Sequence, residues 1–259
     1  MNRFTLVSFF VASVMSFATT VPASAADVSV PTGVEWSGFY AGVNAGAAMS
    51  SGDLTSATEY TDTGYFDGSS VTSIDKAGKA DYDETSFTGG GQIGYNFQHD
   101  NLVIGVEGDL NYLGLNTSDS ASAVYPCCAP DSFTVKQDLS VDWLATARGK
   151  LGVAVNQVLL YGTGGLAFGN VDHHGHFSDT FEPYSFDSGS CSGVRTGWTA
   201  GAGIEWMMVE NASLKLEYLY YDLGSVSAGS TVPGYDNKFH NEADVSGSII
   251  RAGFNWYIN

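Results

Sequence analysis

Apolar and charged residues alternate along the most apolar segments of this chain. In residues 102–113 the even positions are apolar or aromatic, whereas the odd positions include Glu107, Asp109 and Asn111. A side-chain period of two is that of a β-strand, in which successive residues point to opposite faces. Strands with one charged face and one aromatic-rich apolar face are typical of barrels that keep lipid outside and polar groups inside.

Eight segments show this alternation and are predicted to be strands. They cover residues 36–49, 85–98, 102–115, 138–153, 158–171, 195–208, 213–223 and 245–258. Short connections at 99–101, 154–157 and 209–212 alternate with long ones at 50–84, 116–137, 172–194 and 224–244. This rhythm, with an even number of strands, is typical of outer-membrane barrels. We therefore expect an all-β fold: an eight-stranded antiparallel transmembrane β-barrel with short periplasmic turns and four long extracellular loops.

Charged residues recur at the positions that would face the interior of such a barrel. They are Glu107, Asp109, Arg148, Lys150, Glu205, Lys215, Glu217 and Arg251. Eight strands leave an interior just wide enough for side chains to fill, and charges in an apolar surrounding must be paired. We expect Glu107 to face Arg148, and Glu205 to face either Lys215 or, across the interior, Arg251. The cluster is interpreted as a plug of ion pairs; a narrow charged conduit is the alternative.

Aromatic residues occupy the opposite face of the same segments, many of them near segment ends. Those assigned to the lipid interface are Trp143, Trp198, Trp206, Tyr218, Phe254 and Trp256. Aromatic side chains form girdles at both boundaries of the apolar band in outer-membrane barrels. We therefore expect these six side chains to point outward, toward lipid.

The first 25 residues have the pattern of a secretory signal peptide. Arg3 supplies a positive start, an apolar stretch follows, and Ala23-Ser24-Ala25 forms a small-residue cleavage site. The apolar stretch is too short for a spanning helix of about 20 residues. The expected organisation is a signal peptide at 1–25, an N-terminal lead at 26–35 and the barrel at 36–259.

The chain is strongly acidic, with a formal net charge of −18 at pH 7. Nucleic-acid binding needs a basic surface, so no nucleic-acid partner is expected. Apolar residues make up 44% of the chain and aromatic residues 13%, which is enough for a folded body despite the charge. Many of the acidic residues fall between the predicted strands, so the outer loops are expected to be acidic.

Three cysteines and a group of histidines fall in the predicted outer loops. In an oxidising exported compartment, Cys191 is expected to form a disulfide with Cys127 or Cys128. The histidines are His173, His174 and His176. Imidazole and thiolate groups bind transition metals or haem, but this spacing matches no closed site. We interpret the histidines as exposed loop residues and expect neither a bound metal nor a cofactor.

Several segments, taken in order, resemble one protein family. They are WSGFYAGVNAGAA (36–48), GGGQIGYNFQHDNLVIGVEGDLNY (89–112), LLYGTGGLAFGNV (159–171), GWTAGAGIEW (197–206), LKLEYLYYDLG (214–224) and IIRAGFNWYIN (249–259). The chain resembles the small outer-membrane β-barrel proteins of alphaproteobacteria, often named outer-membrane immunogenic or porin-family proteins. The resemblance implies an eight-stranded barrel in the bacterial cell outer membrane, surface-exposed antigenic loops and contact with lipopolysaccharide.

These observations predict an integral outer-membrane β-barrel protein that stabilises the envelope and acts as a surface antigen. Its expected partners are outer-membrane lipid and lipopolysaccharide, and the barrel-assembly machinery during insertion; the sequence leaves the oligomeric state open. The alternative is a narrow pore or a component of haemin or metal uptake, because the family resembled includes reported haemin binders. No enzyme is expected, since bases interleave with the interior carboxylates and no histidine lies within the predicted strands.

Overall fold

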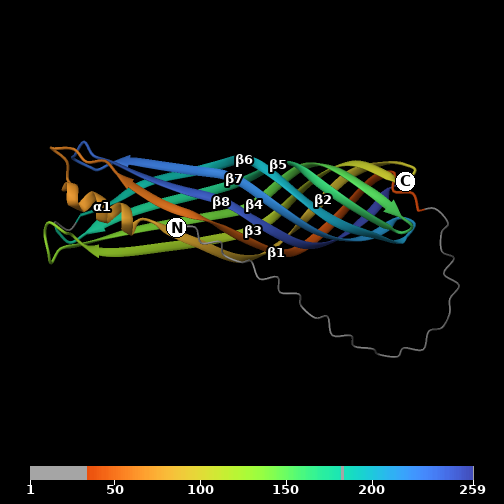
Figure 1. The fold of residues 1–259 in the computed structure, drawn as a ribbon, viewed down its shortest axis with the longest axis horizontal. Coiled ribbons are helices and arrows are strands. Elements are labelled where there is room, and N and C mark those ends of the chain that lie inside the picture. Colours follow the sequence, from red (N-terminus) through yellow and green to blue (C-terminus); the bar gives the residue numbers. More distant parts are fainter. Residues whose placement is uncertain (1–33, 182–183, 259) are drawn as a thin grey trace, which may run out of the picture. The chain divides into compact units, whose positions relative to one another are not determined.

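The computed structural model describes residues 34–181 and 184–258. Within them, eight antiparallel strands pair in sequence order, and β1 pairs with β8 to close a barrel (Figure 1). The strands are β1 (Gly38–Thr58), β2 (Ala80–His99), β3 (Leu102–Val124), β4 (Ser132–Val155), β5 (Val158–Asp179), β6 (Tyr184–Val209), β7 (Ala212–Thr231) and β8 (Lys238–Ile258). The predicted eight-stranded antiparallel barrel is confirmed. The predicted signal peptide and nearly all of the N-terminal lead lie outside the described residues.

Two-residue turns join β2 to β3, β4 to β5 and β6 to β7 at one end of the barrel. Asp100 and Asn156, the first residues of two of these turns, have positive φ angles of 52° and 54°. Tight hairpins favour this backbone conformation, and Asp and Asn adopt it at less cost than most other non-glycine residues. The short connections therefore lie where the sequence predicts them, at the end that faces the periplasm in this kind of barrel.

The strands are much longer than predicted. They contain 20 to 26 residues, about twice the 9–11 residues that cross a bilayer. Most residues of the four predicted outer loops belong to strands instead. The outer connections are only 59–79, 125–131, 180–183 and 232–237. In these outer strand parts one face is in water, so they lack the lipid-facing aromatic residues by which the strands were recognised.

An apolar band on the outward face marks the part of the barrel that spans the membrane. On β1, for example, Phe39 and Met49 bound the band, and the next outward residue, Ser51, is polar. Applied to every strand, this criterion gives the membrane segments 39–49, 87–97, 102–112, 143–155, 158–168, 198–208, 214–220 and 250–258. These lengths are close to what a tilted strand needs to cross lipid. The remaining strand parts, on the side away from the short turns, form the outer segment.

The barrel wall divides in the outer segment. β2 pairs with β3 only between Gly89 and His99, and β6 pairs with β7 only between Trp198 and Val209. Beyond these points, β3 to β6 form one four-stranded sheet, and β7, β8, β1 and β2 form another. The outer segment is therefore two sheets that pack against each other through their inner faces.

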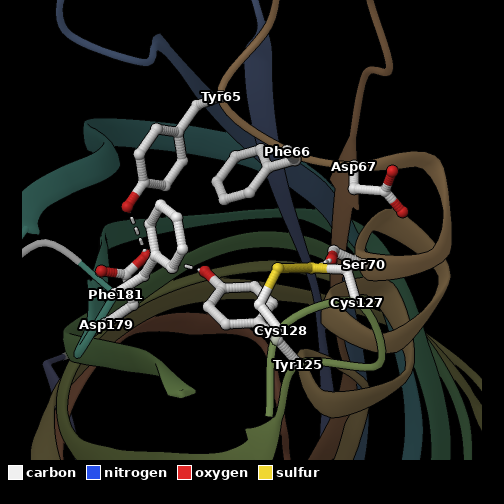
Figure 2. A pocket seen from close by; sticks show the side chains of 9 residues that line it. All are labelled: Tyr65, Phe66, Asp67, Ser70, Tyr125, Cys127, Cys128, Asp179 and Phe181. Atoms are coloured by element: carbon white, nitrogen blue, oxygen red, sulfur yellow. Dashed lines mark hydrogen bonds between the residues drawn. A yellow bond between two sulfur atoms is a disulfide. The ribbon is translucent and has the colours of Figure 1, made fainter. Parts of the chain in front are cut away.

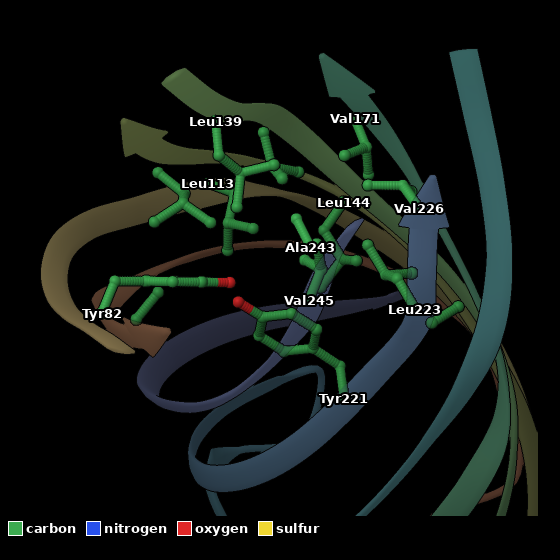
Figure 3. Packing of buried hydrophobic residues seen from close by; sticks show 14 of the residues in the cluster. Tyr82, Leu113, Leu139, Leu144, Val171, Tyr221, Leu223, Val226, Ala243 and Val245 are labelled. Carbon is green, nitrogen blue, oxygen red and sulfur yellow. The ribbon is translucent and has the colours of Figure 1, made fainter. Parts of the chain in front are cut away.

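The inner faces of the two sheets build an apolar core. The middle cluster lies next to the membrane segments, where Leu113, Leu139 and Leu144 meet Tyr221, Val226 and Val245 across the interior (Figure 3). Farther out, the outer cluster gathers aromatic rings around Phe177. Phe177 is fully buried, and its ring centroid lies 5.2 to 6.1 Å from those of Phe66, Phe186, Phe239 and Phe133. The interior is thus packed with hydrocarbon well beyond the membrane.

A short helix covers the outer end. α1 (Gly68–Ala77) lies in the connection between β1 and β2 (Figure 1). Asp67 caps it, because its carboxylate accepts the backbone N–H of Ser69 at 2.9 Å. Ile74 is fully buried in the outer cluster, which fixes the helix against the strands. In the part of the chain that the structure describes, no helix is both long and apolar enough to cross a membrane.

Candidate functional site

The eight charged residues assigned to the interior all lie inside the membrane part of the barrel. Their exposed fractions run from 0% for Glu205 to 7% for Asp109. They come from β3, β4, β6, β7 and β8, and each occupies an inward position of its strand. Four are carboxylates and four are bases, so their formal charges cancel. Together they are termed the charge network.

Arg148 lies at the centre of the charge network. Its Nη2 atom contacts Glu107 Oε1 and lies 2.7 Å from Asp109 Oδ2, while its Nη1 atom lies 3.2 Å from Glu217 Oε1. Glu107 is also the register partner of Arg148 across β3 and β4, so these two expected neighbours are in contact. One guanidinium therefore holds three carboxylates, a role suited to its planar fork of donors.

The other bases share the same carboxylates. Lys215 Nζ lies 2.9 Å from Glu107 Oε1. Arg251 Nη2 lies 2.6 Å from Glu217 Oε2 and 3.2 Å from Asp109 Oδ2. Because these side chains are at most 1% exposed, no water is available to replace a lost partner. The ion pairs therefore form one connected set.

Glu205 corrects one expectation. It forms its ion pair with Lys150, at 3.4 Å, and not with Lys215 or Arg251 as predicted. Lys215 is its register partner, but the ammonium group of Lys215 reaches Glu107 instead. A lysine stem is long and flexible, so the charge need not stay beside its neighbour in the sheet.

Tyrosines that the sequence analysis did not assign to the interior complete the network. Tyr40 donates its hydroxyl to Glu107 Oε2 at 2.8 Å, and Tyr161 donates to Glu217 Oε1 at 2.8 Å. Lys150 Nζ lies 4.6 Å from the centroid of the Tyr161 ring, a cation–π distance. Both tyrosines occupy inward positions of their strands, so the alternation alone would have placed them in the interior. They were missed because the prediction assigned aromatic residues to the lipid face.

The six aromatic residues assigned to the lipid interface all point outward. Trp198, Trp206, Tyr218 and Trp256 are 47% to 50% exposed, and Trp143 and Phe254 are half-buried among outward neighbours. Trp143 and Trp198 lie where the apolar band gives way to polar positions. The Tyr218 hydroxyl lies 2.8 Å from Ser248 Oγ, so its polar end is hydrogen-bonded at that boundary. This arrangement suits a bilayer interface.

The predicted disulfide of Cys191 is wrong. Cys127 and Cys128 are bonded to each other in the connection between β3 and β4, and Cys191 is a free thiol. Cys191 on β6 lies level with Leu139 on β4, seven residues from the end of β4 at Ser132. At about 3.4 Å per residue this is more than 20 Å from the connection, and a disulfide needs Cα atoms within about 7 Å.

The alternation of β5 separates the three histidines. His173 points inward and is fully buried, with its Nε2 atom 3.3 Å from Gln137 Oε1. Burial lowers the pKa of His173, and the neighbouring His174 lowers it further. His174 and His176 point outward. The prediction that these histidines lie in an exposed loop is therefore wrong: all three lie on β5, and His173 is also buried. Among the described residues, no three His, Cys, Asp or Glu side chains form a metal site.

His176 makes two contacts in the order found in serine hydrolases. Ser185 Oγ lies 2.9 Å from His176 Nε2, and Asp187 Oδ1 lies 3.4 Å from His176 Nδ1. The side chains of His176 and Asp187 are 45% and 77% exposed, so water competes for the contact and salt screens it. We therefore interpret these contacts as ordinary hydrogen bonds between neighbouring polar side chains on a solvent-exposed strand face, and not as a catalytic triad.

A closed barrel of eight strands, apolar outside and charged within, is the architecture of an integral outer-membrane protein. The chain belongs to the family described as the outer membrane protein beta-barrel domain, whose model matches residues 9–257. It is similar to the 31 kDa outer-membrane immunogenic protein of Brucella melitensis, with 32% identity over 97% of this chain and 96% of that protein. It is also similar to a 22 kDa outer membrane protein of Rhizobium leguminosarum, with 33% identity over 60% of this chain and 64% of that one. The predicted family and outer-membrane location are confirmed.

Solved structures give more distant matches. The outer membrane protein OprG of Pseudomonas aeruginosa is 14% identical, with a TM-score of 0.44 over 86% of this chain and 97% of that one. Neisserial surface protein A is 12% identical, with a TM-score of 0.34 over 86% of this chain and 98% of that one.

Proposed function

We propose that this outer-membrane protein is a closed structural barrel that stabilises the envelope and presents its outer segment at the cell surface. The observation that carries the proposal is the charge network, whose four acids and four bases are buried against one another at one level of the membrane. A conducting pore needs water-filled space beside its charges, and barrels that provide it have about 16–18 strands. Here the side chains take up that space.

The middle and outer clusters support the same conclusion. Any ion that passed the charge network would next meet the packed leucine, valine and tyrosine side chains of the middle cluster. It would then meet the phenylalanine rings of the outer cluster. Moving an ion through dry hydrocarbon of this kind is very costly. Two barriers of different chemistry therefore stand in series along the barrel.

The surface role rests on the outer segment and on the relatives. The Brucella melitensis relative is named an outer-membrane immunogenic protein. In this chain the outward face of the outer segment is polar and rigidly held by two paired sheets, a form that exposes many side chains to the outside. The alternatives, a narrow pore and haemin or metal uptake, are less well supported, because the interior is packed and the three histidines do not share a site.

Thiol labelling tests whether the interior is closed. In a background with Cys127, Cys128 and Cys191 replaced by serine, Thr146→Cys places a thiol in the charge network and Ser118→Cys places one on the wet outer face. A small charged maleimide added to refolded protein in vesicles should label Ser118→Cys and leave Thr146→Cys unmodified. Rapid labelling of both variants would contradict the closed barrel.

Conductance gives a second test of the closed interior, and a cell assay tests the envelope role. Wild-type protein, shown to be folded by its heat-modifiable migration, should give no stable conductance step in planar bilayers. Large stable steps would support the pore instead. A strain without the gene should become more sensitive to bile salts, with the wild-type gene restoring resistance; unchanged sensitivity would refute the envelope role while leaving the closed barrel intact.

A further inference from the structure

A small cavity opens at the outer end of the barrel, at the point farthest from the short turns. Three outer connections meet there: the one that leads into α1, the one between β3 and β4, and the one that follows β5 (Figure 2). The cavity is about 90 Å³ and partly open to solvent. Its lining includes the side chains of Tyr65, Phe66, Asp67, Tyr125, Asp179 and Phe181.

Among the described residues, the lining combines four aromatic rings with two carboxylates and contains no base. Tyr65 and Tyr125 both donate their hydroxyl groups to Asp179 Oδ2, each at 2.7 Å, and Figure 2 shows both rings turned toward that carboxylate. The disulfide of Cys127 and Cys128 lies across the cavity from Asp179 (Figure 2). Negative charge and π faces therefore surround the space.

Both phenol groups donate their protons to Asp179, and the Tyr125 phenol stays neutral. Burial raises the pKa of Tyr125, and the neighbouring Asp179 raises it further, so the phenol keeps its proton. Because the hydroxyl protons of Tyr65 and Tyr125 go to Asp179, the rings offer π surface to a ligand and no strong hydrogen-bond donor. A neutral phenol that donates to a carboxylate is well suited to attract a cation over its ring.

We propose that this cavity binds a methylated ammonium group, such as the head of choline. A cation is favoured by the Asp179 carboxylate, which lies among the rings (Figure 2), and by the aromatic rings, which attract positive charge at close range. A primary ammonium has three N–H groups. Asp179 Oδ2 already accepts twice, so Asp179 Oδ1 is the one oxygen of that carboxylate without a hydrogen bond, and the other N–H groups would lose their hydration uncompensated. A methylated ammonium has no such requirement.

The size of the cavity limits what enters it. Sites that enclose drug-sized ligands measure about 300–1,000 Å³, so only a compact head group is held here and the rest of the ligand projects into solvent. Two sources provide this chemistry: a free solute such as choline, or the phosphocholine head of a lipid. The two differ by a phosphate, which the acidic surroundings of Asp67 and Asp179 disfavour.

The test is calorimetric titration of the full-length refolded protein with choline, phosphocholine and 3,3-dimethyl-1-butanol, the neutral isostere of choline. The detergent is octyl glucoside, since phosphocholine and amine-oxide detergents carry the group in question. Choline should bind at millimolar concentration and the isostere should not. Weaker binding of phosphocholine than of choline points to a free solute, and equal or tighter binding points to a lipid head; both support the methylated ammonium.

Variants locate the binding. Asp179→Asn removes the charge at nearly constant shape and should weaken choline binding about tenfold. Phe181→Ala removes a ring that is 54% exposed and so leaves the packing of the fold intact; it should also weaken binding. Tyr60→Leu removes an aromatic side chain from the same connection as Tyr65 but outside the lining, and should change nothing. No detectable choline binding, equal binding of the isostere, or unchanged binding in both Asp179→Asn and Phe181→Ala would overturn the proposal.

Discussion

Replacing Arg148 by methionine tests whether the charge network holds the barrel together as a unit. Methionine fills most of the volume of arginine, so the change removes a charge without opening a large cavity. It leaves four carboxylates and three bases. Glu205 keeps its pair with Lys150, and Lys215 and Arg251 remain as the other bases near Glu107, Asp109 and Glu217. One buried negative charge is then uncompensated.

The structure sets the size of the effect. Removing one partner of a buried, hydrogen-bonded ion pair costs about 3–5 kcal/mol of folding free energy, because the remaining charge keeps its desolvation penalty. Arg148 contacts three carboxylates at 0–1% exposure, so the upper part of that range is expected. The matched control lies on the same strand: Lys136 pairs with Asp138 at 2.9 Å, but both are more than 40% exposed. Lys136→Met should cost about 0–1 kcal/mol.

The assay is equilibrium unfolding in urea of protein refolded into lipid vesicles, followed by tryptophan fluorescence and by heat-modifiable migration. Adding Asp109→Asn to Arg148→Met makes the network neutral again. The double variant should therefore lose about 1–3 kcal/mol less unfolding free energy than the two single variants lose together. The reasoning is refuted if Arg148→Met is no more destabilising than Lys136→Met, or if the two network substitutions are additive.

Three further predictions concern packing, crowding and pH. Phe177→Ala should destabilise the outer segment by about 3–5 kcal/mol, seen as faster proteolysis of its strands while the membrane part keeps its heat-modifiable migration; an unchanged digestion rate would argue against the outer cluster. Gly94→Val should cost about 1–3 kcal/mol in urea unfolding because its side chain would displace the Tyr40 phenol, whereas Gly91→Val on the lipid face of the same strand should be tolerated; equal effects would show that the interior is loosely packed. Because burial lowers the pKa of His173, the unfolded chain takes up a proton there before the folded protein does, so stability is full above about pH 6.5 and falls as the pH drops below it; His173→Gln should flatten the thermal midpoint against pH in this range, and an unchanged profile would assign the effect elsewhere.

The membrane part of the fold was predictable because two physical signals coincide there. Lipid outside and paired charges inside force opposite character on alternate residues, so Glu107 and Arg148 stand out within apolar strands. The register of β3 and β4 then brings them together as direct partners, because a slip by one residue would turn every side chain to the opposite face. Which base pairs with Glu205 was less predictable. Lys215 is its register partner, yet the long side chain of Lys215 extends to Glu107, and Lys150 pairs with Glu205 instead.

The outer segment was not predictable from the same signal. Between Ser132 and Val141, polar residues alternate with Phe133, Val135 and Leu139, but no aromatic lipid face marks the strand. A strand that exposes one face to solvent and lies outside the membrane has a composition similar to that of a loop. The missed strands in turn explain the missed disulfide, because a loop would have let Cys191 approach Cys127 or Cys128, whereas a fixed ladder holds it more than 20 Å away.

The division of the outer segment into two rigid sheets determines what an antibody would find on the folded protein. In each strand only every second side chain faces water, so a continuous peptide contributes at most half of its residues to any footprint. An epitope must therefore gather residues from neighbouring strands, such as Ser118 on β3 and its register partner Asp138 on β4. Sera raised against unfolded chain would recognise continuous peptides in which every second side chain, such as Phe133 or Phe177, is buried in the folded protein, and would bind intact cells poorly.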